Sequence, residues 1–128
     1  MNLLGIDFGR KKIGLAISEG NLPKPLKTIR VKIPENALTE IKKIVNEEKI
    51  DKIIVGFSEG IIGNESKKFA EFLKKNVNTE VELEDETLSS QNAQNQLLSM
   101  KKQRKKRKKL EDSVSAALIL ENYISNNA

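Results

Sequence analysis

The hydrophobic and polar positions along the chain predict five strands and four helices. Short apolar or alternating runs indicate strands, and apolar residues spaced three or four apart indicate helices. The strands are expected at residues 2–8, 12–18, 26–32, 52–57 and 80–84. The helices are expected from Pro34, after a two-glycine loop at 58–63, from Ser89 or Ser90, and over 110–124. Residues 19–25 contain Gly and two Pro and are expected to form a turn.

The order of these elements predicts an α/β fold in one domain that spans residues 1–128. Strands 1 to 3 follow one another through short turns, so strand 2 should run antiparallel to its neighbours. The later strands are separated by helices, which is typical of parallel crossover connections. We therefore expect a five-stranded mixed sheet with strand 2 antiparallel, strand 3 at an edge, and helices on both faces.

Composition excludes several kinds of chemistry. The chain contains no Cys and no His, which removes disulfides, thiolate nucleophiles and imidazole ligands or bases. An enzyme of this composition would depend on carboxylates, which prefer hard ions such as Mg²⁺ or Mn²⁺. No apolar run is as long as a membrane span, and Met1 leads straight into a strand without a signal pattern. We expect a cytoplasmic protein of ordinary globular composition with no membrane partner.

The positive charge of the chain is concentrated in one segment. The net charge is +5, but without residues 101–109 the chain has 15 basic and 18 acidic residues, a net charge of −3. The cations of this basic tract are Lys101, Lys102, Arg104, Lys105, Lys106, Arg107, Lys108 and Lys109. Such a tract is either a solvated, mobile loop or a contact for nucleic acid, and its place just before Asp112 favours the second. Because Trp is absent and other aromatic residues are few, we expect recognition of backbone and shape.

Three acidic residues occupy positions where strands end or a helix begins. Asp7 ends the first strand, Glu86 follows the fifth, and Asp112 lies in the first turn of the last helix. Ligands of open α/β sheets usually bind at the carboxyl ends of strands, so these carboxylates could converge on one site. Each also has a simpler interpretation: Asp7 as a turn former, Glu86 as a solvated acid, and Asp112 as a partner of the helix dipole.

The same residues carry a resemblance to a known family. The chain resembles the YqgF/RuvX family along nearly its whole length. The motifs that carry the resemblance are the segments 5–9 and 12–18, Ile54-Val55-Gly56 with the later Gly63, Asp85-Glu86, and Asp112 with residues 116–120. That family comprises candidate Holliday junction resolvases or pre-16S rRNA nucleases with a ribonuclease H-like fold.

The resemblance implies a metal-dependent nuclease whose metal-binding catalytic acids are Asp7, Glu86 and Asp112, with Mg²⁺ or Mn²⁺ as cofactor. Asp7 would bridge two ions, and Asp85 is the alternative to Glu86. Thr87 stands where the family has Arg, which removes a phosphate contact. Basic Arg10, Lys11 and Lys12 beside Asp7 would compensate for it.

Three other departures, Arg10 in place of Thr, Glu19 in place of Asp and Ser58 in place of Pro, leave the acids intact. The expected substrate is structured RNA, most directly the 5′ end of pre-16S rRNA, with branched DNA as the alternative. A non-catalytic nucleic-acid-binding module is a further alternative. Two-lobed ATPases share the Asp-x-Gly hairpin but need a second lobe, which this chain lacks. A monomer and a homodimer are both compatible with the sequence.

Overall fold

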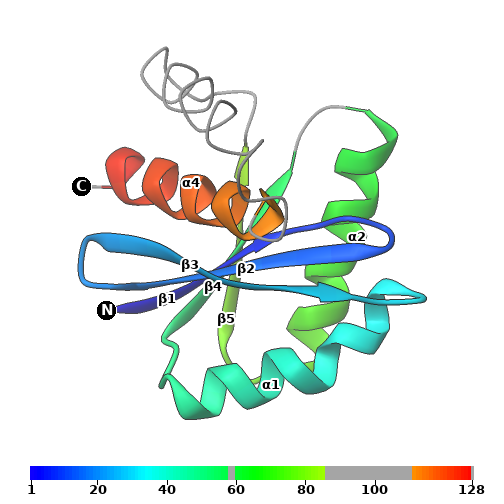
Figure 1. Ribbon diagram of the computed structural model, residues 1–128, viewed down its shortest axis with the longest axis horizontal. Helices are drawn as coiled ribbons and strands as arrows, with labels where there is room; N and C mark the ends of the chain where they lie inside the picture. Colours follow the sequence, from blue (N-terminus) through cyan, green and yellow to red (C-terminus); the bar gives the residue numbers. More distant parts are fainter. Residues whose placement is uncertain (58–59, 86–110, 128) are drawn as a thin grey trace.

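Five strands form one mixed sheet in the order β3-β2-β1-β4-β5 (Figure 1). The computed structural model describes residues 1–57, 60–85 and 111–127. The strands are β1 (Asn2–Asp7), β2 (Lys12–Glu19), β3 (Leu22–Arg30), β4 (Lys52–Phe57) and β5 (Glu80–Asp85). β2 is antiparallel to β1 and β3, whereas β1, β4 and β5 are mutually parallel. The predicted mixed sheet with strand 2 antiparallel and strand 3 at an edge is confirmed.

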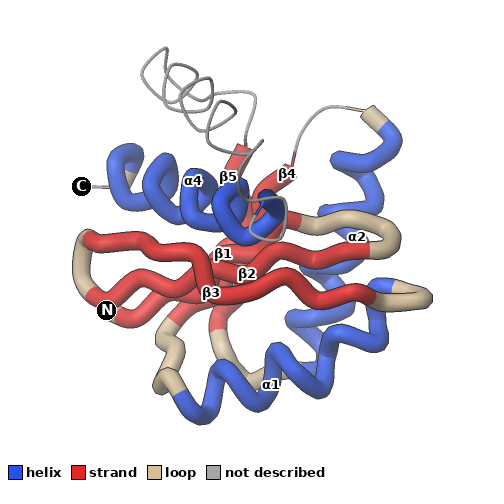
Figure 2. Tube along the Cα trace, in the orientation of Figure 1, coloured by secondary structure: helices blue, strands red, loops and turns tan. Residues whose placement is uncertain are grey.

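Helices cover both faces of this sheet (Figure 2). The described helices are the 3₁₀ helix η1 (Pro34–Ala37), α1 (Leu38–Glu47), α2 (Ile61–Asn76) and α4 (Glu111–Asn126). α1 and α2 pack on one face through Ile41, Ile44, Phe69 and Leu73. α4 packs alone among the described helices on the other face, so helices on both faces are also confirmed. None of the helices in the described residues is long and apolar enough to cross a membrane.

The alternation of side chains along the strands divides the core into two layers. Leu4 and Ile6 of β1, and Phe8 directly after it, point toward α1 and α2, in the larger cluster. Leu3 belongs to the smaller cluster, with Ile54 and residues of α4. The two layers are expected, because successive side chains of a strand point to opposite faces and helices cover both faces of this sheet. This parity fixes which strand residues can face α4.

Two predicted boundaries, the starts of the third strand and of the second helix, are wrong by more than two residues. β3 begins at Leu22, inside the expected turn cluster, and it includes Pro23 and Pro25. Proline is tolerated there because β3 lies at the edge of the sheet, where half of the backbone N–H groups need no partner strand. The expected glycine loop ends early, because α2 begins at Ile61 and so contains Gly63. The helix expected from Ser89 or Ser90 and the basic tract lie outside the described residues.

Candidate functional site

Asp7 is the last residue of β1 and points to the face covered by α4. The residues two and four positions earlier, Gly5 and Leu3, both contact α4, and strand alternation gives Asp7 the same face. Its side chain is half-buried at the carboxyl end of the central strand. The position therefore matches the carboxyl ends of the parallel strands, where ligands of open α/β sheets bind.

Gly14 allows the beginning of α4 to lie against this edge. It is the register partner of Asp7 in the β1–β2 ladder. A Cβ atom built on Gly14 would lie 2.0 Å from the carbonyl oxygen of Asp112 and 2.8 Å from its Cβ. The first turn of α4 thus rests on the strand beside Asp7, at a distance that a side chain at position 14 would forbid. Asp112 therefore begins α4 next to Gly14, the register partner of Asp7.

Gly5 of β1 also allows a close approach of α4, at a point just over one helical turn after Asp112. A Cβ atom at position 5 would lie 2.7 Å from the carbonyl oxygen of Ala116 and 2.6 Å from Cγ of Leu120. Close packing of a helix backbone on a strand requires small residues at the crossing point, because interiors leave no spare volume. Gly5 and Gly14 together set the height of α4 above the sheet and with it the place of Asp112.

The third predicted acid, Glu86, lies outside the described residues, so its position is not part of the observed site. Within the described residues, no group of three acidic side chains is arranged to hold a metal ion. Asp85 ends β5, and alternation with Val81 and Leu83 of the larger core cluster places it on the opposite face from Asp7.

Glu84 is an acidic residue on the site's face that the sequence analysis did not select. The register aligns Gly14, Asp7, Gly56 and Glu84 in one row across β2, β1, β4 and β5. Glu84 is 9% exposed, and burial raises the pKa of its carboxyl. Nδ2 of Asn126 donates a hydrogen bond of 2.8 Å to it, which opposes that rise in pKa. The alternation of Glu80, Glu82 and Glu84 was the signal that could have identified it.

The far end of α4 is tied to the sheet by a polar cluster of Lys52, Glu82 and Tyr123. Nζ of Lys52 donates to the Tyr123 hydroxyl at 2.9 Å and lies 3.1 Å from Oε2 of Glu82. The Tyr123 hydroxyl donates to the same Glu82 carboxylate. The two hydrogen bonds lower the pKa of Glu82, and the bond from Tyr123 has the larger effect. Because the cluster fixes the C-terminal half of α4, it also restrains the helix that carries Asp112.

The predicted basic residues divide into three groups. Arg10 is paired with Glu65 of α2 through Nε to Oε2 at 2.8 Å and Nη2 to Oε1 at 2.9 Å. The pair raises the pKa of Arg10 and lowers that of Glu65, chiefly through the hydrogen bonds. Lys11 and Lys12 are exposed in the β1–β2 turn and the first position of β2. The eight cations of the basic tract lie outside the described residues.

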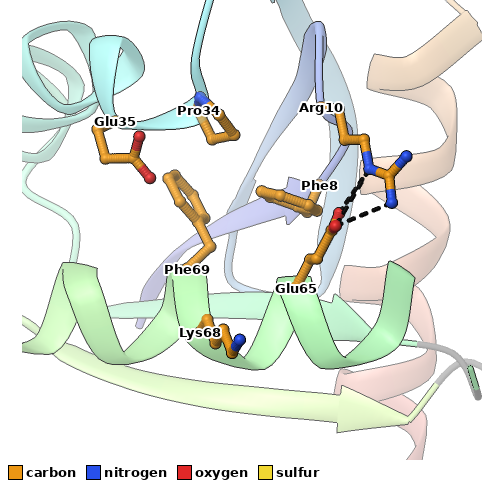
Figure 3. A pocket seen from close by; sticks show the side chains of 7 residues that line it. All are labelled: Phe8, Arg10, Pro34, Glu35, Glu65, Lys68 and Phe69. Atoms are coloured by element: carbon orange, nitrogen blue, oxygen red, sulfur yellow. Dashed lines mark hydrogen bonds and ion pairs between the residues drawn. The ribbon is translucent and has the colours of Figure 1, made fainter. Parts of the chain in front are cut away.

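A pocket of about 280 Å³ opens on the other side of β1 from Asp7 (Figure 3). Its floor is the apolar surface of Phe8, Phe69 and Pro34, and the two phenyl rings lie 5.2 Å apart between centroids. The Arg10–Glu65 pair closes one side, and Glu35 of η1 stands on the other. Sequence patterns gave no sign of this pocket, because its walls come from the β1–β2 turn, η1 and α2.

Solved structures with the same fold identify its class. Thermus thermophilus RuvC in complex with a Holliday junction substrate aligns with a TM-score of 0.61 at 14% identity, over 99% of this chain and 95% of that one. Fowlpox virus resolvase, solved with substrate Holliday junction DNA, aligns with a TM-score of 0.58 at 19% identity, over 98% and 96%. The chain therefore has the ribonuclease H-like fold of resolvases, as predicted.

Sequence comparison assigns the family within that class. Residues 1–126 match the family described as "RuvX: Holliday junction resolvase", and the chain belongs to that family. A Clostridium acetobutylicum protein named "Putative pre-16S rRNA nuclease" is 37% identical over 98% of this chain and 99% of its own length. A Halothermothrix orenii protein of the same name is 34% identical over 98% of this chain and 95% of its own length. The resemblance noted in the sequence is confirmed.

Proposed function

We propose that this protein is a divalent-metal-dependent nuclease that hydrolyses phosphodiester bonds in structured nucleic acid. The observation that carries the proposal is the contact of Asp112 with Gly14, the register partner of Asp7. The backbone of Asp112 lies beside the strand partner of Asp7 at the carboxyl end of the central strand, and this supports a site that both carboxylates share. Like charges about 4 Å apart repel by roughly 4 kcal/mol at an effective dielectric near 20, so a bound cation would favour such a pair.

Asp7, Asp112 and Glu86 are the residues that would hold Mg²⁺ or Mn²⁺. Their donor set fits a hard ion, because it consists of carboxylate oxygens in a chain without Cys or His. Metal ions bound there would supply an activated water and charge stabilisation for the leaving oxygen. Glu86 is preferred to Asp85 as the third acid, because Asp85 lies on the sheet face opposite Asp7.

The basic residues would bind and orient the phosphate backbone. Exposed Lys11 and Lys12 lie within five positions of Asp7 in the chain, and the basic tract immediately precedes the helix that carries Asp112. Each phosphate contact would release condensed counterions, so binding should weaken steeply as salt increases. Arg10 would contribute less to this binding than Lys11 and Lys12, because Glu65 already occupies its guanidinium.

The substrate that we propose is the 5′ end of pre-16S ribosomal RNA, in the cytoplasm. This substrate is supported by the name of two relatives, which are 37% and 34% identical to this chain over nearly its full length. The second candidate is a four-way DNA junction, supported by the family description and by the junction complexes among the structural neighbours. Both substrates present the same phosphodiester to the same acids. A junction resolvase would also require a homodimer with two active sites.

Parallel cleavage assays with Asp7→Asn test the proposal. Asp51→Asn is a matched control, because Asp51 is exposed at the opposite end of the sheet, where it accepts a hydrogen bond from the Asn2 amide at 2.7 Å. We expect Asp7→Asn to reduce Mg²⁺-dependent cleavage at least about a hundredfold, the scale of losing a key electrostatic contribution, while Asp51→Asn retains it. Equal cleavage by Asp7→Asn and wild type would support the non-catalytic alternative. Comparison of pre-16S rRNA with a synthetic junction would separate the two substrates.

A further inference from the structure

Thr28 of β3 has a buried hydroxyl oxygen without a hydrogen-bond partner among the residues that the structure describes. A buried donor that lacks a partner carries its full desolvation cost, so its presence in a folded protein calls for a reason. We propose that Thr28 is a positioning residue for Asp112, and that its hydroxyl donates a hydrogen bond to the Asp112 carboxylate when that carboxylate binds a divalent cation. The inference deepens the proposed function and rests on it, because it takes Asp112 to be a metal ligand.

The register of the sheet places Thr28 on the same face as Asp7 and beside the start of α4. Thr28 is the partner of Gly14 in the β2–β3 ladder, and Gly14 is the partner of Asp7 in the β1–β2 ladder. Directly opposed residues of antiparallel strands point to the same face, and α4 packs against both β2 and β3. Ile29, the next residue of β3, belongs to the larger core cluster on the opposite face, as alternation requires. The side chain of Thr28 therefore faces α4.

Gly14 also limits how far Thr28 lies from Asp112. A Cβ atom built on Gly14 lies 2.8 Å from Cβ of Asp112, and opposed Cβ atoms of antiparallel strands are about 4.5–5.5 Å apart. The Cβ atoms of Thr28 and Asp112 are therefore at most about 8 Å apart, and about 6 Å apart where α4 lies directly above the strand. From about 6 Å, rotation of the two short side chains brings the hydroxyl and carboxylate oxygens to the roughly 2.5–3.0 Å of an O–H···O hydrogen bond.

Asp112 is the acceptor that the surrounding groups leave for this hydroxyl. Ser113 and Ser115, the serines at the start of α4, already have interaction partners, and so does Asp7. Asp7 also lies two strands away from Thr28, roughly 10 Å at the usual spacing of neighbouring strands. The half-buried carboxylate of Asp112 has no hydrogen bond or ion pair within the described parts of the chain. One donor and one acceptor, each without a partner there, thus lie on adjoining elements.

A hydrogen bond between these two groups would orient Asp112 as a metal ligand. A carboxylate that binds a cation through one oxygen can accept a hydrogen bond with its other oxygen, which restricts the rotation of the side chain. Outer partners of metal ligands typically contribute about 10–100-fold in metal affinity. Because the Thr28 hydroxyl is buried, nucleic acid outside the fold does not compete for it. Its role is therefore limited to the side chain that it positions.

Thr28→Val and Thr28→Ser test this assignment in the intact chain. Valine keeps the shape of threonine and removes the hydroxyl, whereas serine keeps the hydroxyl. We would measure the melting temperature of each variant in EDTA, and its affinity for Mn²⁺ by titration followed by electron paramagnetic resonance. Neither measurement depends on nuclease activity. Thr39→Val is the matched control, because Thr39 is exposed on α1, which packs on the other face of the sheet.

Thr28→Val should change stability and metal affinity in opposite directions. Removal of an unpaired buried hydroxyl should raise the melting temperature in EDTA by about 4 °C or more. Loss of the contact to Asp112 should weaken Mn²⁺ binding by about tenfold or more. Thr28→Ser should retain the wild-type affinity for Mn²⁺, and Thr39→Val should match wild type in that affinity. A hydroxyl with a purely structural role would not combine a more stable protein with weaker metal binding.

Two results would overturn the proposal and leave the proposed nuclease function intact. A lower melting temperature for Thr28→Val would show that the hydroxyl has a structural partner. Unchanged Mn²⁺ affinity in Thr28→Val would show that Asp112 binds metal without help from Thr28. Failure of the proposed function is recognised separately: the wild-type protein would bind no Mn²⁺, and wild type and Asp7→Asn would cleave the full substrates equally. That outcome would overturn the role of Thr28 as well.

Discussion

Replacement of Gly14 by Ala should separate the placement of Asp112 from the rest of the fold. The added Cβ would lie 2.0 Å from the carbonyl oxygen of Asp112, whereas ordinary van der Waals contact begins at 3.4 Å. The first turn of α4 must therefore retreat by about 1.4 Å, given those two distances. A misplacement of about 1 Å in a catalytic constellation can cost about a hundredfold in rate. We expect a loss of cleavage of at least that size, with a loss of about 1–3 kcal/mol in the free energy of unfolding from overpacking.

Gly20→Ala is the control for the loss of stability. Gly20 lies in the β2–β3 turn at the opposite end of β2, with φ at +66° and no atom within 4 Å of an added Cβ. The left-handed backbone makes Ala unfavourable there by about 1–2 kcal/mol, without moving α4. Thermal unfolding of the two variants should therefore be similar, while metal-dependent cleavage falls only in Gly14→Ala. A folded Gly14→Ala protein that cleaves at the wild-type rate would refute the role assigned to this contact.

Two further predictions concern the attachment of α4 and the basic tract. Tyr123→Phe should reduce the free energy of unfolding by about 1 kcal/mol at neutral pH, because Glu82 loses a hydrogen bond in a half-exposed setting. The folded-state pKa of Glu82 is lowered, so this contribution is present above its ordinary value near 4.5 and is lost as pH falls through the lowered pKa. Chemical denaturation should show a larger difference between Tyr123→Phe and wild type at pH 7 than at low pH, where only the hydrogen bond from Lys52 to Tyr123 remains to be lost, and a difference that does not change with pH would contradict this origin. Replacing four of the eight cations in residues 101–109 by Gln should weaken nucleic-acid binding and make its dependence on log salt shallower by about 0.7–0.9 per lost phosphate contact. An unchanged slope would show that the tract does not contact phosphate.

Local patterns in the sequence were sufficient for most of the secondary structure. The strand at Lys52–Phe57 was predicted with its observed bounds, because a continuous apolar run between polar residues has few alternatives. The start of β3 was not, because Pro23 and Pro25 usually interrupt a strand and only an edge position makes them harmless. Gly63 was assigned to a loop because glycine usually interrupts a helix, yet it is buried inside α2.

The candidate site was predictable residue by residue, but not as an arrangement. The ends of strands and the first turn of the last helix identified Asp7 and Asp112 as acids at element boundaries. Nothing in their separation along the chain indicates that α4 begins on top of Gly14. Similarly, Phe8 and Phe69 are core positions in any reading of the sequence, and the pocket beside them appears only when η1 and α2 are in place.

The sequence by itself determined the order of strands and helices, the covered faces, the absence of thiol and imidazole chemistry, and the acids available. These depend on periodicity and composition, which are local properties of the chain. Only the tertiary structure decided that Asp7 and Asp112 share one edge, that Asp85 faces away from it, and that Glu35 borders an aromatic pocket. Those facts depend on the register between strands and on how closely α4 approaches Gly5 and Gly14. Contacts between residues a hundred positions apart are set by packing of the whole domain, which periodicity does not encode.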